Sequence, residues 1–130
     1  MIGAIRQIDR QQLATLLTRP WARRIASVHV QHTWRPAHAD WRGEPTVEAI
    51  RRFHVDVLRW SDIGQHLTVG PDGSLWTGRD LDLPPASAVG HNGSAQEGPL
   101  LVAIVGDFDR GRDAFDGAQA DATYAAIASV

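Results

Sequence analysis

The sequence contains no cysteine, so it offers neither a disulfide framework nor a thiolate metal ligand. Any zinc site would have to use histidine, carboxylate or water ligands. No apolar run approaches the roughly 18 residues that a membrane-spanning helix requires, so we expect no membrane partner. Charge of one sign is also missing, because 13 Lys and Arg against 15 Asp and Glu give a net charge of −2. Nucleic acid is therefore not an expected partner.

The start of the sequence does not read as a secretory signal. The segment MIGAIRQIDR reaches Asp9 and Arg10 too early to contain the apolar core of such a signal. We therefore expect a cytoplasmic protein, with periplasmic or extracellular export by a route hidden in the sequence as the alternative. The 130 residues suffice for one domain, 1–130, that holds a hydrophobic core without cross-links.

Local patterns predict three helices. The capping-box pairs Asp9 with Gln12 and Asp116 with Gln119 predict the first and the last helix. Thr46 is the expected N-cap of the middle helix. The spacing of that helix predicts an inward face made of Val47, Ile50, His54, Val57 and Leu58.

The remaining patterns predict strands. Alternating residues over 24–33 predict one strand, and two β-rich runs around the Pro-Asp-Gly turn of 71–73 predict a hairpin. Residues 80–99 read as a long surface loop. The continuous apolar run PLLVAIVGDF predicts a central strand that is covered on both faces. The order of elements therefore predicts an α/β fold in which helices flank a central mixed β-sheet.

Four segments of the sequence resemble a known family. VHVQHTW, WSDIGQHLTVGPDGSLWTGR, GHN and VAIVGDFD occur in the order and spacing of the peptidoglycan recognition proteins and the related zinc N-acetylmuramoyl-L-alanine amidases. The corresponding family segments look like VIHHT, WSDIGYHFLIGRDGRVYEGR, GYN or GHN, and GIALVGDF. The resemblance runs from about residue 24 to the last residue, and we expect that the family's C-terminal portion is absent from this chain. It implies a peptidoglycan-recognition or amidase-like fold with a groove that holds a muramyl peptide.

The resemblance also implies a zinc site in active family members. There, zinc polarises the amide between muramic acid and L-alanine and activates a water molecule. The first ligand position falls on Gln31, the later ligands follow the last helix, and Gln65 stands where many active members carry a tyrosine that assists the transition state. Because a glutamine amide is a poor zinc ligand, we expect a degenerate site without bound zinc and a chain that is inactive by itself. His29 is a weak replacement candidate, since it lies about 6.6 Å along the strand from Gln31.

Six residues correspond to positions that line the groove of the family. They are His32, Thr33, Trp34, Arg79, His91 and Asn92. His32 and Thr33 would hydrogen-bond the peptide, or make only the polar contacts of a strand end. Trp34 would form a stacking wall, or instead anchor its own loop. Arg79 would pair with a carboxylate of the stem peptide, or lie on the surface over Trp76.

Loop chemistry offers an alternative for the remaining groove residues and for two carboxylates. Asn92, which would contact the peptide backbone, is also a common turn former. Asp107 and Asp109 could be paired catalytic carboxylates, but their place at a strand end favours turn chemistry.

The other histidines have less specific expectations. We expect His66 to be buried and hydrogen-bonded, and His54 to be a satisfied core residue on the apolar face of its helix. His38 is expected to be solvated in its polar loop.

Three functions remain open from the sequence. The chain would recognise muramyl peptides of the cell wall, or belong to an amidase whose remaining ligands lie beyond Val130. Alternatively it would act as a non-catalytic binding or protein-interaction module, in intracellular sensing or in a phage or defence system. The last helix has no C-terminal capping residue, so a second chain or a dimer partner is expected there.

Overall fold

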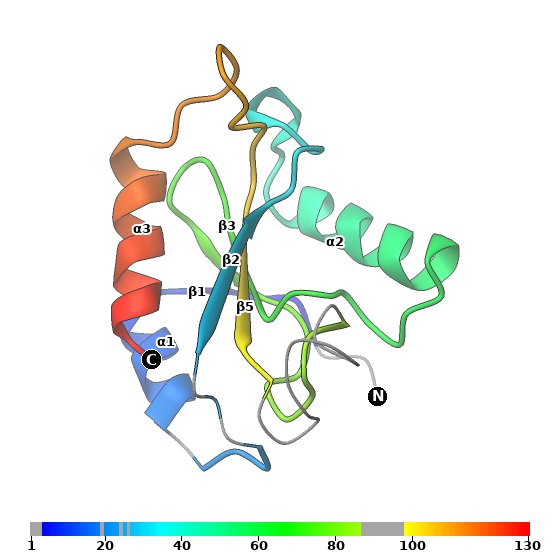
Figure 1. Ribbon diagram of the computed structural model, residues 1–130, viewed down its shortest axis with the longest axis vertical. Helices are drawn as coiled ribbons and strands as arrows, with labels where there is room; N and C mark the ends of the chain where they lie inside the picture. Colours follow the sequence, from blue (N-terminus) through cyan, green and yellow to red (C-terminus); the bar gives the residue numbers. More distant parts are fainter. Residues whose placement is uncertain (1–3, 19, 24, 26, 87–97) are drawn as a thin grey trace.

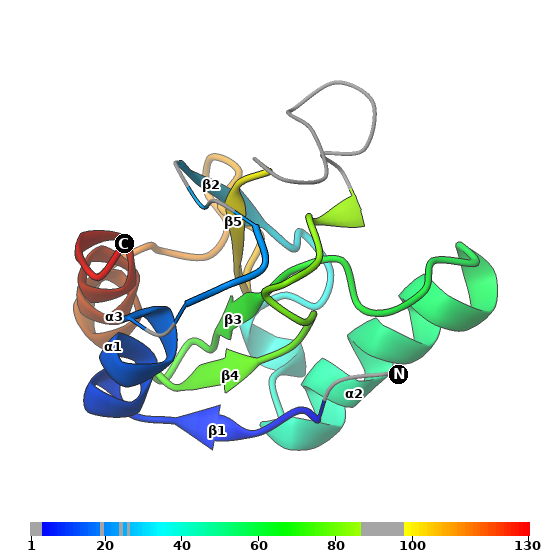
Figure 2. The ribbon, with the colours of Figure 1, turned by 90° about the horizontal axis from the view of Figure 1, so that it is seen from below.

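The computed structural model describes residues 4–18, 20–23, 25, 27–86 and 98–130. Five strands form one mixed sheet in the order β1-β4-β3-β5-β2. Helices α1 and α3 cover one face of this sheet, and α2 covers the other (Figures 1 and 2). The predicted α/β fold with a central mixed sheet is therefore confirmed. Among the described residues, no helix is both long and apolar enough to cross a membrane.

The centre of the sheet is parallel. Strand β5 (Leu100–Ile104) lies between β3 (Leu67–Val69) and β2 (Val28–His32) and is parallel to both. Every residue of β5 is buried, as the continuous apolar run predicted. Strand β2 is shorter than the predicted 24–33 and lies at the sheet edge, which leaves Val30 44% exposed.

The predicted hairpin is confirmed. Strand β4 (Leu75–Thr77) is antiparallel to β3, and β1 (Gln7–Ile8) extends the sheet beyond β4. The turn closes through a hydrogen bond from Gly70 N to Ser74 O of 2.9 Å. Gly73 has φ of +82°, a conformation that glycine adopts without the steric cost of a side chain.

The first helix, α1 (Arg10–Thr18), begins with the predicted capping box. The backbone N–H of Asp9 donates to Gln12 Oε1 at 2.8 Å, and that of Gln12 donates to Asp9 Oδ1 at 2.7 Å. Two backbone donors that the helix leaves free are thereby satisfied.

The middle helix, α2 (Glu44–Arg52), begins earlier than predicted. Gly43 is its N-cap and Pro45 occupies the first turn, where a missing N–H costs nothing. Thr46 already lies inside the helix, so the prediction that it caps the helix is wrong. Its Oγ1 instead accepts a hydrogen bond of 2.7 Å from the backbone N–H of Arg42, just before the helix.

A π-helical turn, η2 (Phe53–Val57), continues α2. Val47 and Ile50 are buried as predicted, but Val57 and Leu58 are 62% and 40% exposed. The wider π turn accommodates more residues per turn, so side chains beyond it leave the 3.6-residue stripe. The predicted inward face is therefore wrong for its last two members.

The last helix, α3 (Gly117–Ala128), forms as predicted, but its capping box does not. The side chain of Asp116 makes no cap hydrogen bond, and Gln119 is 1% exposed with its amide bonded elsewhere. Tyr124, Ile127 and Val130 are exposed. A partner chain at this helix stays a prediction.

Candidate functional site

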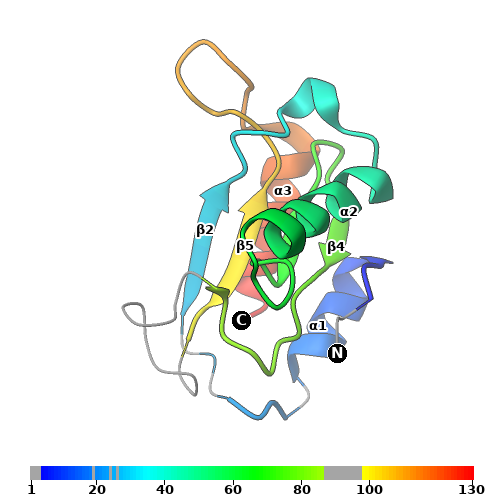
Figure 3. The ribbon, with the colours of Figure 1, turned by 90° about the vertical axis from the view of Figure 1, so that its right-hand side faces the viewer.

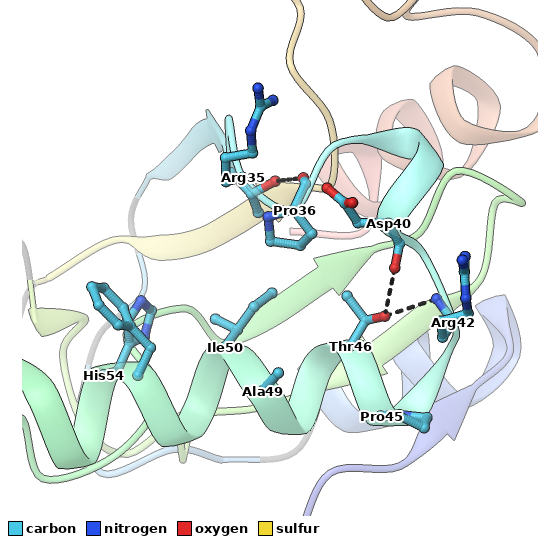
Figure 4. Close-up of a pocket in the computed structure, with 11 residues that line it drawn as sticks. Arg35, Pro36, Asp40, Arg42, Pro45, Thr46, Ala49, Ile50 and His54 are labelled. Atoms are coloured by element: carbon cyan, nitrogen blue, oxygen red, sulfur yellow. Dashed lines mark hydrogen bonds between the residues drawn. The ribbon is translucent and has the colours of Figure 1, made fainter.

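A cavity of about 550 Å³ lies between α2 and the segment that follows β2 (Figure 4). The segment 33–42 forms one wall, and α2 forms the other. Its lining includes Thr33, Pro36 and Asp40 from the segment and Thr46, Ala49, Ile50 and His54 from α2 and η2. Its volume falls within the range of small-ligand sites, roughly 300–1,000 Å³.

The segment wall is fixed by hydrogen bonds to its own backbone and to the sheet. Thr33 Oγ1 donates to Pro36 O at 2.7 Å and accepts from the N–H of Gly106, after β5, at 3.1 Å. The N–H of Ala37 donates to Asp40 Oδ2 at 2.8 Å. The wall is therefore connected to the ends of two neighbouring strands.

The two walls meet at Thr46. Its Oγ1 accepts from the N–H of Arg42 at 2.7 Å and donates to the carbonyl oxygen of Asp40 at 3.4 Å, as Figure 4 shows. Beyond this corner, Pro36 and Ile50 provide apolar surface. The exposed residues Arg35 and Arg42 lie at the rim, where Arg35 Nη1 is 3.5 Å from Asp107 Oδ2 and Arg42 Nη1 donates to Trp41 O at 2.8 Å. The cavity can thus hold a ligand that alternates apolar and polar groups.

His54 is a cavity residue that the sequence interpretation missed. Its Nδ1 accepts the N–H of Gly64 at 2.9 Å, so it is satisfied as predicted, but its ring also lines the cavity. Because Nδ1 accepts, the neutral ring carries its hydrogen on Nε2. Burial, followed by the charge of Arg79, lowers the pKa of His54 and favours this neutral form. The sequence signal that could have indicated a cavity residue is that His54 is polar while the rest of its helix face, including Ile50, is apolar.

Of the predicted groove residues that the structure describes, Thr33 lines this cavity. His32 lies at the exposed end of β2, with its ring centroid 5.9 Å from that of Phe108. Trp34 is 55% exposed, and the guanidinium of Arg35, in the same loop, lies 5.0 Å from its ring centroid, so its role as a loop anchor also stays a prediction. His32 and Trp34 as ligand contacts stay predictions.

Arg79 lies elsewhere. It is 9% exposed and lines a smaller cavity of about 250 Å³, together with Trp21 and His66. Its Nε donates to Pro84 O at 2.7 Å. The alternative of a surface arginine over Trp76 is therefore wrong, while its pairing with a stem-peptide carboxylate stays a prediction.

The predicted residues His91 and Asn92 lie outside the described residues.

Gln31 and Gln65, for which the family resemblance predicted catalytic positions, lie near the same strip of the sheet. Gln31 pairs with Ala103 of β5, which pairs in turn with Thr68 of β3. Val28 packs against the hydrophobic core on the sheet face that α1 and α3 cover. Because side chains alternate along a strand, His29 and Gln31 point to the other face, toward α2. The Nε2 of buried Gln65 donates to Thr68 Oγ1 at 3.2 Å.

This strip does not have the donor set of a zinc site. Within the described parts of the chain, no group of three or more His, Cys, Asp or Glu residues could hold a metal ion. Gln31 offers a neutral amide and His29 a single imidazole, whereas zinc sites use three or four imidazole, thiolate or carboxylate ligands. The expected loss of zinc stays a prediction.

The structure confirms the prediction for His66 but not the one for His38. His66 is 2% exposed, accepts the N–H of Leu101 at Nδ1 and lies 2.7 Å from Leu83 O through Nε2, so a buried, bonded imidazole is confirmed. His38 is not simply solvated, because its Nε2 lies 2.8 Å from Gln119 Oε1.

Asp107 has the predicted turn role. Its Oδ1 accepts the N–H of Asp109 at 3.2 Å, and its carbonyl oxygen accepts the N–H of Asp113 at 2.8 Å. The guanidinium of Arg35 lies 3.5 Å from its other carboxylate oxygen. These contacts organise the loop after β5.

The architecture defines a class of protein: an α/β domain with the fold of the peptidoglycan recognition proteins. Drosophila PGRP-LB matches with a TM-score of 0.68 and 22% identity, over 85% of this chain and 62% of that one. A Drosophila PGRP-LB variant in complex with tracheal cytotoxin matches with a TM-score of 0.64 and 20% identity, over 98% and 66%. Human PGRP-IBETAC in complex with glycosamyl muramyl pentapeptide matches with a TM-score of 0.59 and 21% identity, over 78% and 62%.

Sequence comparison finds N-acetylmuramoyl-L-alanine amidases. The human N-acetylmuramoyl-L-alanine amidase is 34% identical over 87 residues, which are 65% of this chain and 14% of that protein. The mouse protein of the same name is 34% identical over 93 residues, 65% of this chain and 16% of the relative. No protein-family model matches the chain. The resemblance to the peptidoglycan recognition protein and amidase family that the sequence motifs indicated is therefore confirmed.

Proposed function

We propose that this chain binds muramyl peptides in the cavity between α2 and segment 33–42. The observation that carries the proposal is a cavity of about 550 Å³ in a fold whose solved relatives hold tracheal cytotoxin and a muramyl pentapeptide. Those relatives are 20–21% identical to this chain, so the shared fold supports the type of ligand but not the individual ligand contacts.

The chemistry of the cavity suits such a ligand. A muramyl peptide alternates amide groups with small apolar side chains and ends in carboxylates. The Nε2–H of His54 would donate to an amide carbonyl, and the carboxylate of Asp40 would accept an amide N–H. Arg35 and Arg42 at the rim would attract the carboxylates, and the exposed position makes this attraction sensitive to salt.

The proposal includes binding without hydrolysis by this chain. Gln31 is the supporting residue, because it presents a neutral amide on the sheet face where the family resemblance places the first zinc ligand. Incubation of the chain with N-acetylmuramyl-L-alanyl-D-isoglutamine and zinc should release no free N-acetylmuramic acid. Release of the sugar at a rate above the zinc-only blank would overturn this part.

Calorimetric titration with N-acetylmuramyl-L-alanyl-D-isoglutamine tests the binding. Ala49 is exposed on α2 and its methyl group lines the cavity, so Ala49→Trp should fill the space without disturbing the core. The control is Ala128→Trp, the same change at an exposed alanine of α3 on the opposite face of the sheet.

The unaltered chain and Ala128→Trp should bind with equal affinity, and Ala49→Trp should lose at least about ten-fold, the equivalent of about 1.4 kcal/mol. Equal affinity of all three proteins would place the ligand outside this cavity.

A further inference from the structure

The side chain of Gln119 connects three segments that are distant in the sequence. Its Nε2 donates to the carbonyl oxygens of Val69, in β3, at 3.2 Å and of Val105, after β5, at 2.8 Å. Its Oε1 lies 2.8 Å from Nε2 of His38, in the cavity wall. Gln119 is 1% exposed and belongs to α3, on the sheet face opposite α2. Figure 3 shows α3 and α2 on either side of the sheet.

These bonds determine the state of His38. Because both hydrogens of the Gln119 amide point to carbonyl oxygens, Oε1 accepts and His38 presents Nε2–H. The ring also meets the edge of Phe108, with centroids 5.5 Å apart and planes at 81°. The backbone N–H of His38 donates to Asp113 Oδ2 at 2.8 Å. His38 is thus held through both its backbone and its ring.

His38 lies in the wall between two residues that line the cavity, Pro36 and Asp40. It begins the 3₁₀ turn η1 (His38–Asp40), and the N–H of Asp40 donates to Ala37 O at 3.0 Å. The ring itself is not part of the cavity lining and binds α3 instead. Restraint of the ring therefore restrains the wall without any contact to the ligand.

We propose that Gln119 is a positioning residue for muramyl peptide recognition, acting through its hydrogen bond to His38 to hold the cavity wall in place. The inference rests on the proposed function and adds α3 to the elements that determine the cavity. A wall that is already ordered before binding costs less entropy when the ligand arrives. Loss of the bond should therefore weaken binding although no ligand contact is removed.

Two substitutions of His38 test this role while they leave the buried amide of Gln119 intact. In His38→Gln, the side-chain amide nitrogen reaches about as far as Nε2 and can still donate to Gln119 Oε1. In His38→Asn, the amide nitrogen reaches only about as far as Nδ1 and cannot. Both variants lose the ring contact with Phe108, so the comparison isolates the hydrogen bond.

The readouts are affinity for N-acetylmuramyl-L-alanyl-D-isoglutamine and hydrogen exchange of the backbone amides of Ala37, Asp40 and Trp41. His38→Asn should bind about five-fold more weakly than His38→Gln, as expected for one hydrogen bond, and its wall amides should exchange faster. A thermal unfolding curve for each variant confirms that it is folded.

Two results overturn the inference, and they are distinguishable. If the natural chain binds the muramyl peptide but the two variants agree in affinity and in exchange, Gln119 does not position the wall. If the natural chain does not bind this ligand, the proposed function fails, and with it the role in recognition. Faster exchange in His38→Asn alone would then still show that the hydrogen bond orders the wall.

Discussion

His66 and Arg23 lie side by side in the interior although both are bases, with Nε2 of the imidazole 3.1 Å from Nη2 of the guanidinium. The Nδ1 of His66 accepts the N–H of Leu101 at 3.0 Å, so the neutral ring has its hydrogen on Nε2 and donates it to Leu83 O at 2.7 Å. Arg23 in turn donates Nε to Leu81 O at 2.7 Å. His66 is thus satisfied only while its ring is neutral, because a proton on Nδ1 would face the N–H of Leu101.

Acid should destabilise the protein through His66. Burial, with the charges of Arg23 and Arg79, lowers the pKa of His66 from its ordinary value of 6.5 to about 3, although the bond to Leu83 O acts in the other direction. Between these values the unfolded chain binds a proton that the folded chain does not. The free energy of unfolding should therefore be maximal above pH 6.5 and fall below it, at up to roughly 1.4 kcal/mol per pH unit.

Urea unfolding at pH 7.5, 5.5 and 4.5 measures this slope. His66→Gln is the matched variant, because an amide offers an acceptor and a donor but does not titrate in this range. It should be less stable at pH 7.5 and should lose most of the slope, leaving the smaller contribution of His54, whose pKa is also lowered. The same slope in both proteins would show that His66 is not its source.

The hairpin turn provides a second test, by comparing two glycines with nearly the same backbone angle. Gly73 and Gly111 have φ of +82° and +80°, but a Cβ at Gly73 would lie 2.8 Å from Ala118 O, whereas at Gly111 nothing lies within 4 Å. Gly111→Ala should cost about 1 kcal/mol for the left-handed conformation. Gly73→Ala should cost more in a thermal or urea unfolding experiment, because α3 must also shift. Equal losses would argue against close packing of the turn on α3.

His54 should contribute to binding through Nε2 and to stability through Nδ1. In His54→Asn, the side-chain oxygen can replace Nδ1 as acceptor for the N–H of Gly64, but the donor at the Nε2 position is lost. Affinity for the muramyl peptide should fall about three- to ten-fold with little change in stability. His54→Leu should lose both affinity and stability. Undiminished binding by His54→Asn would remove His54 from the ligand contacts.

Arg79 should stabilise the fold. Its Nε, Nη1 and Nη2 donate to Pro84 O, Ile63 O and Ser61 Oγ at 2.7, 3.4 and 3.4 Å. Arg79→Ala would leave buried carbonyl oxygens without donors, at a cost of about 1–3 kcal/mol in the free energy of unfolding. Exposed Arg112 gives the control, and Arg112→Ala should be near neutral. Identical urea midpoints for the two variants would contradict this structural role.

The two capping-box patterns show how much of the fold could be predicted from the sequence. Asp9 and Gln12 are both exposed and form the box. Asp116 and Gln119 have the same spacing, yet Gln119 turns inward to the carbonyl oxygens of Val69 and Val105. A local pattern decides the outcome only where no tertiary partner competes.

The candidate site was harder to predict for the same reason. Strands and the hairpin follow from period and turn chemistry, and the family motifs located Thr33. His38 sits in a polar loop, and nothing in its neighbours indicates the contact with Gln119, 81 residues away in the sequence. The apolar spacing of its helix predicts a core position for His54, because such spacing does not distinguish a core face from an adjoining cavity wall.

The central claim is that the muramyl peptide binds between α2 and segment 33–42. A titration of the isotope-labelled protein with N-acetylmuramyl-L-alanyl-D-isoglutamine, followed by backbone amide NMR shifts, tests it most directly. The largest shifts should fall on Thr33, on residues 40–46 and on residues 49–54. Shifts confined to the second cavity around Arg79 and His66, or no saturable shifts at all, would contradict the claim.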